Sequence, residues 1–75
     1  MRAMSTRLTY GRNDSDSASL DLGWMQAARL AAALANILSR GGKFSQRSFT
    51  TSVESPRVSW KNRDYFIVVE RTKDE

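Results

Sequence analysis

The chain has 75 residues, a formal net charge of +4, and neither cysteine nor histidine. The missing thiols and imidazoles exclude disulfides, thiolate and imidazole catalysis, and the zinc sites that these side chains build. A charged fraction of 27% beside 40% hydrophobic residues is typical of a folded domain, and this length leaves room for one small core.

The first predicted element is a strand at residues 4–10. Its side chains alternate, and one face of the strand carries Met4, Thr6, Leu8 and Tyr10. The following run, residues 11–19, is rich in Gly, Asn, Asp and Ser, whose side chains compete with the backbone for hydrogen bonds. We therefore predict a polar loop there.

The clearest periodic pattern predicts an amphipathic helix at residues 20–40. Its apolar residues recur at helical spacing and form one stripe, made of Leu20, Trp24, Ala27, Leu30, Ala31, Leu34, Ile37 and Leu38. Gly41 and Gly42 follow the basic residue Arg40, which is typical of a helix that ends in a left-handed turn. We expect the stripe to form the core.

Three more strands are predicted, at residues 44–53, 57–61 and 64–71. Pro56 separates the first two, and Asn62 suits a hairpin turn between the last two. The last strand is apolar on both faces, so we expect it inside the sheet and not at an edge. The charged tail, residues 72–75, is predicted to fray.

Together these elements predict a single α+β domain over residues 1–75. It has two layers, with one long amphipathic helix packed on a small, mostly antiparallel sheet, in the order strand, helix, strand, strand, strand (β-α-β-β-β). With short connections, successive elements alternate in direction. The helix end and the turn at residues 61–64 then meet at one end of the domain, and the loop at residues 11–19 lies at the other.

This layout predicts a cluster of basic side chains, which we call the basic pole: Arg2, Arg40, Lys43, Lys61 and Arg63. Such a cluster can contact nucleic-acid phosphates or an acidic patch on a protein. The alternative is an ordinary solvated surface, because lysine and arginine are common on proteins that bind no anion. Exposed rings for base stacking are not expected, because the core can accommodate Tyr10, Trp24, Phe49, Trp60 and Phe66.

A second candidate surface is a ridge of mostly small side chains on the helix, formed by Met25, Ala28, Ala32, Ala35 and Ser39. Small residues would let a partner helix or a second copy approach closely. The alternative, which we favour, is that alanine is simply the best helix former and costs nothing when exposed.

No motif in the sequence supports catalysis, a cofactor or a metal. Asp14, Asp16 and Asp21 lack the glycine and bidentate glutamate of a calcium loop, and Gly41 and Gly42 follow a helix, whereas a phosphate-binding loop precedes one. No apolar run suits a secretory signal or a membrane span, so an intracellular location is expected, with organelle import as the alternative because of the basic, Ser-rich start.

The sequence therefore favours a non-catalytic binding module, an accessory, adaptor or inhibitor protein of the kind encoded by phages and mobile elements. It would dock on a larger protein or nucleoprotein through the basic pole and the helix surface. The alternative is a sequence-nonspecific nucleic-acid-binding protein that uses the basic pole alone.

Overall fold

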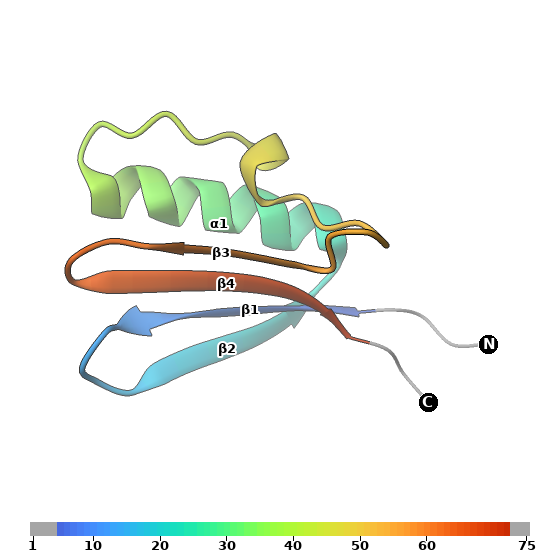
Figure 1. Cartoon of the computed structure of the whole chain (residues 1–75), viewed down its shortest axis with the longest axis horizontal. Coiled ribbons are helices and arrows are strands. Elements are labelled where there is room, and N and C mark those ends of the chain that lie inside the picture. Colours follow the sequence, from blue (N-terminus) through green and yellow to red (C-terminus); the bar gives the residue numbers. More distant parts are fainter. Residues whose placement is uncertain (1–4, 73–75) are drawn as a thin grey trace.

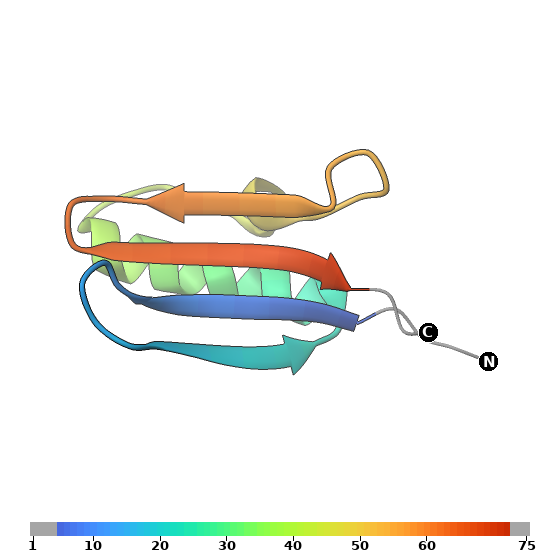
Figure 2. The ribbon, with the colours of Figure 1, turned by 60° about the horizontal axis from the view of Figure 1, so that its bottom comes forward.

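The computed structural model describes residues 5–72, and it shows one helix packed on one face of a four-stranded sheet (Figures 1 and 2). Along the chain lie β1 (Ser5–Arg12), β2 (Ser17–Leu22), α1 (Trp24–Ser39), the short 3₁₀ helix η1 (Gln46–Phe49), β3 (Arg57–Lys61) and β4 (Tyr65–Thr72). All neighbouring strands are antiparallel, in the sheet order β2-β1-β4-β3. The predicted two-layer α+β fold is confirmed, but two strands precede the helix.

The first correction concerns the segment that leads into the helix. Residues 17–22, predicted as loop and first helical turn, form β2, which pairs along its whole length with β1. Leu20 and Leu22 alternate with polar residues, a pattern that suits a strand as well as a helix. Gly23 then takes an extended conformation, with φ −67° and ψ 156°, and the helix begins at Trp24.

The second correction concerns residues 44–53, which were predicted as a strand. The side chain of Asn36 holds Phe44 against the helix: its Oδ1 accepts from the Phe44 amide at 2.8 Å, and its Nδ2 donates to the Phe44 carbonyl at 2.9 Å. η1 follows and buries Phe49, whose ring lies 5.9 Å from that of Phe44. Two aromatic residues thus anchor this segment to the core, and no strand partner is needed.

The other predicted elements agree closely with the structure. β1, β3 and β4 match the strands predicted at 4–10, 57–61 and 64–71 to within two residues, although Met4 lies outside the described residues. β4 lies between β1 and β3, inside the sheet as expected. The helix ends with Arg40 in the left-handed region at φ 58° and Gly41 at φ 102°, which confirms the predicted stop. Of the predicted tail, residue 72 belongs to β4 and residues 73–75 lie outside the described residues.

The helix presents alanine to the sheet, which corrects the prediction of both helix surfaces. Its buried residues are Ala27, Ala28, Ala31, Ala32 and Ala35. Of the larger helical residues in the predicted stripe, Leu34 and Leu38 are only partly buried, and Trp24, Leu30 and Ile37 are exposed. Because alanine side chains are small, the helix can lie close to the inner sheet residues Leu8, Ile67 and Val69, which are fully buried.

The predicted helix ridge is therefore not a docking surface. Ala28, Ala32 and Ala35 are covered by the rest of the domain, and only Met25 of that set is exposed. Ser39 is half-buried, and its Oγ accepts a hydrogen bond from the Gly42 amide at 3.0 Å.

Candidate binding surface

The end of the domain where α1 finishes also holds the turn between β3 and β4 and the tip of the β1–β2 hairpin (Figure 1). Arg40 and Lys43 follow the helix, and Lys61 and Arg63 flank the turn. All four of these basic-pole residues are exposed. Arg2 lies outside the described residues. The prediction that the helix end and the β3–β4 turn share one end of the domain is thus confirmed.

Asn62 shapes the turn that carries Lys61 and Arg63. Its Oδ1 accepts from the amides of Asp64 at 2.9 Å and Tyr65 at 2.7 Å. Its Nδ2 lies 3.4 Å from the carbonyl oxygen of Leu38, near the end of the helix, a distance typical of a weak hydrogen bond. One asparagine therefore both closes the turn and ties it to the helical layer.

Asn13 connects the two hairpins at the same end. Its backbone amide donates to the Asp64 carbonyl at 2.8 Å, and its Nδ2 donates to the carbonyls of Asn62 at 3.0 Å and Arg63 at 2.9 Å. These three bonds hold the tip of the β1–β2 hairpin against the turn that carries the basic residues. The part of the basic pole on the β3–β4 turn is therefore held in place by backbone contacts.

The position of this hairpin tip corrects the predicted charge distribution. Arg12, Asp14 and Asp16 were expected at the opposite end, but the extra strand β2 adds one reversal of chain direction before the helix. The carboxylates of Asp14 and Asp16 therefore join that of Asp64 at this end. The start of β1 lies at the far end, where Ser5 pairs with Thr72.

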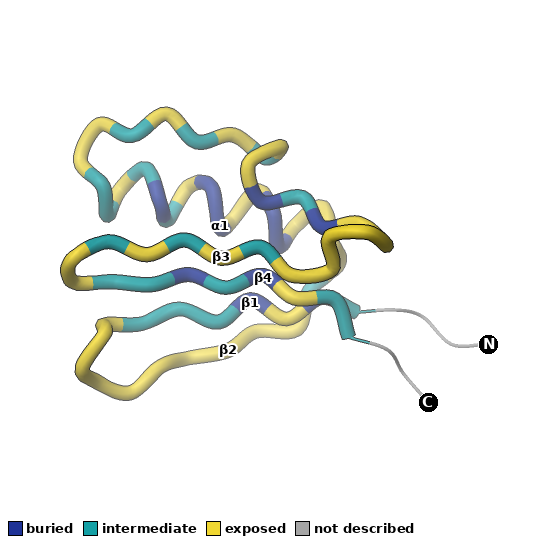
Figure 3. The backbone as a smooth tube through the Cα atoms, in the orientation of Figure 1, coloured by how far each residue is buried: buried dark blue, intermediate teal, exposed yellow. Residues whose placement is uncertain are grey.

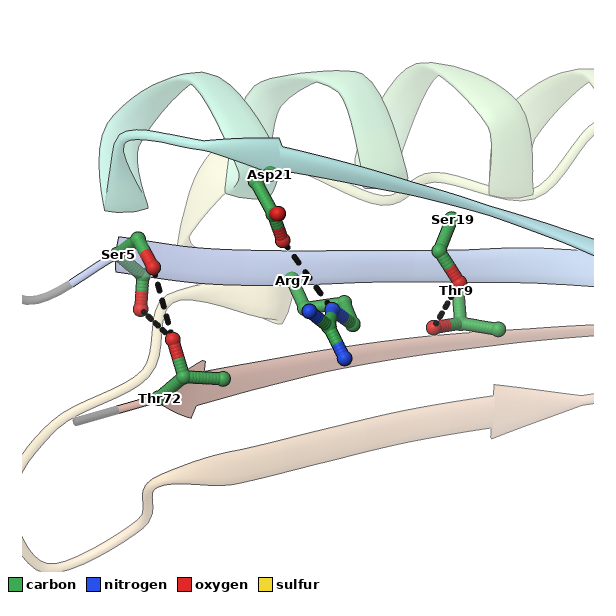
Figure 4. A network of polar contacts seen from close by, with 6 residues as sticks. All are labelled: Ser5, Arg7, Thr9, Ser19, Asp21 and Thr72. Atoms are coloured by element: carbon green, nitrogen blue, oxygen red, sulfur yellow. Dashed lines mark hydrogen bonds and ion pairs between the residues drawn. The ribbon is translucent and has the colours of Figure 1, made fainter. Parts of the chain in front are cut away.

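The basic side chains nevertheless stay unpaired within the described residues. The ion pair found there joins Arg7 Nε to Asp21 Oδ1 at 3.1 Å, on the outer face of the sheet (Figure 4). Arg40, Lys43, Lys61 and Arg63 have no carboxylate within 4.0 Å in the part of the chain that the structure describes. Their charges are thus available to an external anion.

The outer face of the sheet, which α1 leaves uncovered, carries an aromatic side chain that sequence reasoning placed in the core. Leu8, Ile67 and Val69 point toward the helix, so the alternation of β4 turns Phe66 and Val68 outward. Phe66 is half-buried and lies directly opposite Lys61 on β3. The two faces of the apolar strand β4 were predicted, but which face the helix would cover was not.

The same outer face has a row of alternating charges at the end away from the basic pole. Directly opposed residues across β2, β1, β4 and β3 are, in this order, Asp21, Arg7, Glu70 and Arg57. Two polar contacts, Thr9 with Ser19 and Ser5 with Thr72, lie on this face as well (Figure 4). Because the charges in the row balance, this part of the face does not extend the basic surface.

A groove of about 420 Å³ opens on the helix side of the sheet, beside β2. Tyr10, Ala18, Leu34, Leu38 and Tyr65 form its apolar walls, and its rim includes Arg12 and Asp16. The described residues contain no group of three carboxylate, histidine or cysteine side chains placed to hold a metal ion. Within residues 5–72, no helix has the length and apolar character needed to cross a membrane.

Comparison with family models, curated proteins and solved structures finds no match to this chain.

Proposed function

We propose that this protein is a small, non-catalytic binding module that docks by its basic pole on an anionic surface of a larger protein or nucleoprotein. The proposal rests on one observation: four exposed cations, on the helix end and on the β3–β4 turn, gather at one end of the domain, and none of them has a carboxylate partner among residues 5–72. Asn13 and Asn62 brace the turn that carries Lys61 and Arg63. Because this backbone is already ordered, binding of an anion does not require the entropy cost of ordering it.

The four cations are distributed over both layers at this end of the domain. Lys61 belongs to the outer face of the sheet, because it opposes Phe66, whereas Arg40 and Lys43 belong to the helical layer. A flexible or curved anion that passes over the end of the domain would meet all of them. An accessory, adaptor or inhibitor role suits a module of this kind, since it adds no chemistry of its own.

Direct binding of nucleic acid is a second candidate, and Phe66 favours it. A half-buried aromatic ring on an open sheet face, opposite a lysine, offers a base a stacking surface beside a charge for its phosphate. About four phosphate contacts on a single strand would give a slope near −3 for log K against log salt.

Fluorescence anisotropy at two salt concentrations tests the basic pole, with a labelled single-stranded oligonucleotide and a labelled poly-glutamate peptide as probes. We expect Lys61→Glu with Arg63→Glu to weaken binding of at least one probe strongly. The matched control, Arg29→Glu with Arg47→Glu, changes the net charge equally at exposed sites away from the pole and should have a much smaller effect. Equal losses in the two double variants would overturn a localised site.

The second candidate has its own test. Phe66→Leu keeps an apolar side chain on β4 but removes the ring, and it should weaken binding of a base-containing oligonucleotide while leaving an abasic strand of the same length unaffected. Equal affinities of wild type and variant for the base-containing strand would exclude stacking on Phe66. Binding of poly-glutamate but not of either strand would favour an acidic protein partner.

A further inference from the structure

The two edges of the sheet differ in how well they are protected against pairing with another strand. The β3 edge carries Arg57 and Lys61 and begins directly after Pro56, which are the devices that discourage pairing at an exposed edge. The β2 edge, Ser17–Leu22, is exposed along nearly its full length and contains neither lysine, arginine nor proline (Figure 3). β2 is therefore the strand that can accept a further strand.

Apolar side chains stand beside the β2 edge on the helix side of the sheet. Leu20 is 41% exposed, and on the flank of α1 Leu30 is 38% and Ile37 is 71% exposed. The groove lined by Tyr10, Ala18, Leu34 and Leu38 continues this patch toward the basic pole. Figure 2 shows α1 behind β1 and β4, whereas β2 runs along the lower border of the sheet.

We propose that this side of the domain binds a second copy of the chain, with β2 pairing antiparallel to β2 of the partner and the two helix flanks closing over the paired strands. Two observations favour a second copy as the occupant. An edge strand that pairs antiparallel about a two-fold axis is complementary to itself. In addition, the chain has a net charge of +4, and neither β2 nor the helix flank of Leu30, Leu34 and Ile37 carries a basic residue.

The alternation of β2 restricts the register of the paired strands. Leu20 and Leu22 face the helix side and Ser19 and Asp21 the outer side, so directly opposed residues must come from the same face. Placing Leu20 opposite Leu20 of the partner brings Leu22 of the partner beside Ala18, where the groove lies. It also sets Asp21 opposite Ser19 of the partner and so avoids facing carboxylates.

This assembly would give one continuous sheet with both helices on the same face. Because the two β2 strands are antiparallel, the basic poles of the two copies would lie at opposite ends. Burial of the exposed leucines would add apolar core to a domain that has no disulfide. Oligomerisation is a common way to stabilise a chain this small. The inference is independent of the anion-binding role, because neither β2 nor the helix flank includes a residue of the basic pole.

Sedimentation equilibrium of the full chain tests the proposal. We expect a mass of about 17 kDa, twice the 8.5 kDa of the chain, at micromolar concentrations. Leu20→Lys and Ile37→Lys should each raise the dimer dissociation constant by about tenfold or more. The control Val53→Lys adds the same charge at a residue that is 85% exposed and far from β2, so it should leave the dimer intact. Circular dichroism establishes that each variant is folded.

Cross-linking tests the geometry, because the chain contains no cysteine of its own. Leu20→Cys should give a disulfide-linked dimer under mild oxidation, since directly opposed residues of paired strands lie within disulfide range. Ser59→Cys on the β3 edge should not. A wild type that stays monomeric, or cross-linking that is equal at both edges, would overturn the proposal. So would a dimer that neither lysine variant weakens.

Discussion

The side chains of Phe44 and Trp60 meet edge to face, with ring centroids 5.7 Å apart and planes inclined by 75°. Phe44 precedes η1 and Trp60 lies in β3, so this contact joins the segment after the helix to the sheet. Both rings pack against the buried core. The inner face of β3 is therefore covered by the segment at residues 44–49, next to the helix and not beneath it.

Replacing Trp60 by alanine should remove this cover. We expect Trp60→Ala to lower the free energy of unfolding by about 3 kcal/mol, near the low end for loss of a large aromatic side chain because Trp60 is only partly buried. Urea denaturation followed by circular dichroism measures the change. Trp60→Phe keeps an aromatic partner for Phe44 and should lose much less. A Trp60→Ala protein as stable as the wild type would show that this contact is not part of the core.

The alanine face of α1 predicts that added volume is harmful there. Ala31 is fully buried, whereas Ala33 on the opposite side of the helix is exposed. Ala31→Leu should destabilise the domain by about 1–3 kcal/mol through overpacking. Ala33→Leu makes the same alanine-to-leucine change at an exposed site, and leucine has a helix propensity similar to that of alanine. Its unfolding midpoint should therefore stay near that of the wild type. Similar midpoints for the two variants would mean that the helix faces the sheet differently.

The turn that carries Lys61 and Arg63 should depend on the side chain of Asn62. Asn62→Ala removes the acceptor of two backbone amides and the contact with the Leu38 carbonyl, and we expect a loss of about 1–3 kcal/mol. Asn62→Asp keeps the acceptor oxygen but not the donor. It should therefore lie between wild type and Asn62→Ala in thermal melts, and an order in which Asn62→Asp is the least stable would contradict this account.

Gly42 should tolerate no side chain. A Cβ at this position would overlap the Ser39 Oγ and lie 2.7 Å from Phe44 Cε2. Gly42→Ala would thus disturb both the hydrogen bond at the helix end and the aromatic anchor, and we expect a loss of about 1–3 kcal/mol in urea denaturation. Gly23→Ala is the matched control, because its Cβ would meet nothing closer than Gln26 Oε1 at 3.9 Å. Equal urea midpoints for the two variants would show that crowding at Gly42 does not affect stability.

The parts of the fold that were predicted correctly are those where one local pattern has one structural solution. Alternation identified β1 and β3, a short run that is apolar on both faces identified β4, and Asn62 between two strands identified the hairpin. The prediction for residues 17–22 was wrong because Leu20 fits helical spacing with Trp24 and also strand spacing with Leu22. The prediction for residues 44–53 was wrong because the conformation of this segment depends on contacts with Asn36 and Trp60, which are distant in sequence.

The candidate surfaces, like the fold, were predicted correctly only in part. The relative position of Arg40 and Arg63 was predicted correctly, because residues 44–53, although they form no strand, still carry the chain back alongside the helix before β3 begins (Figure 1). Because β2 was not predicted, Asp14 and Asp16 were assigned to the wrong end of the domain. On the helix, periodicity located an apolar half, but only packing decided that the alanines, and not Leu30 and Ile37, would face the sheet.

Arg40 occupies a backbone conformation that suits glycine better than arginine, with φ at 58°. An L-residue there costs about 1 kcal/mol, so Arg40→Gly should make the domain more stable while it removes a cation from the basic pole. Folding and binding thus place opposite demands on this single position. A sequence optimised for stability alone would choose glycine at residue 40, and the gain would come at the expense of the surface that we propose meets the partner.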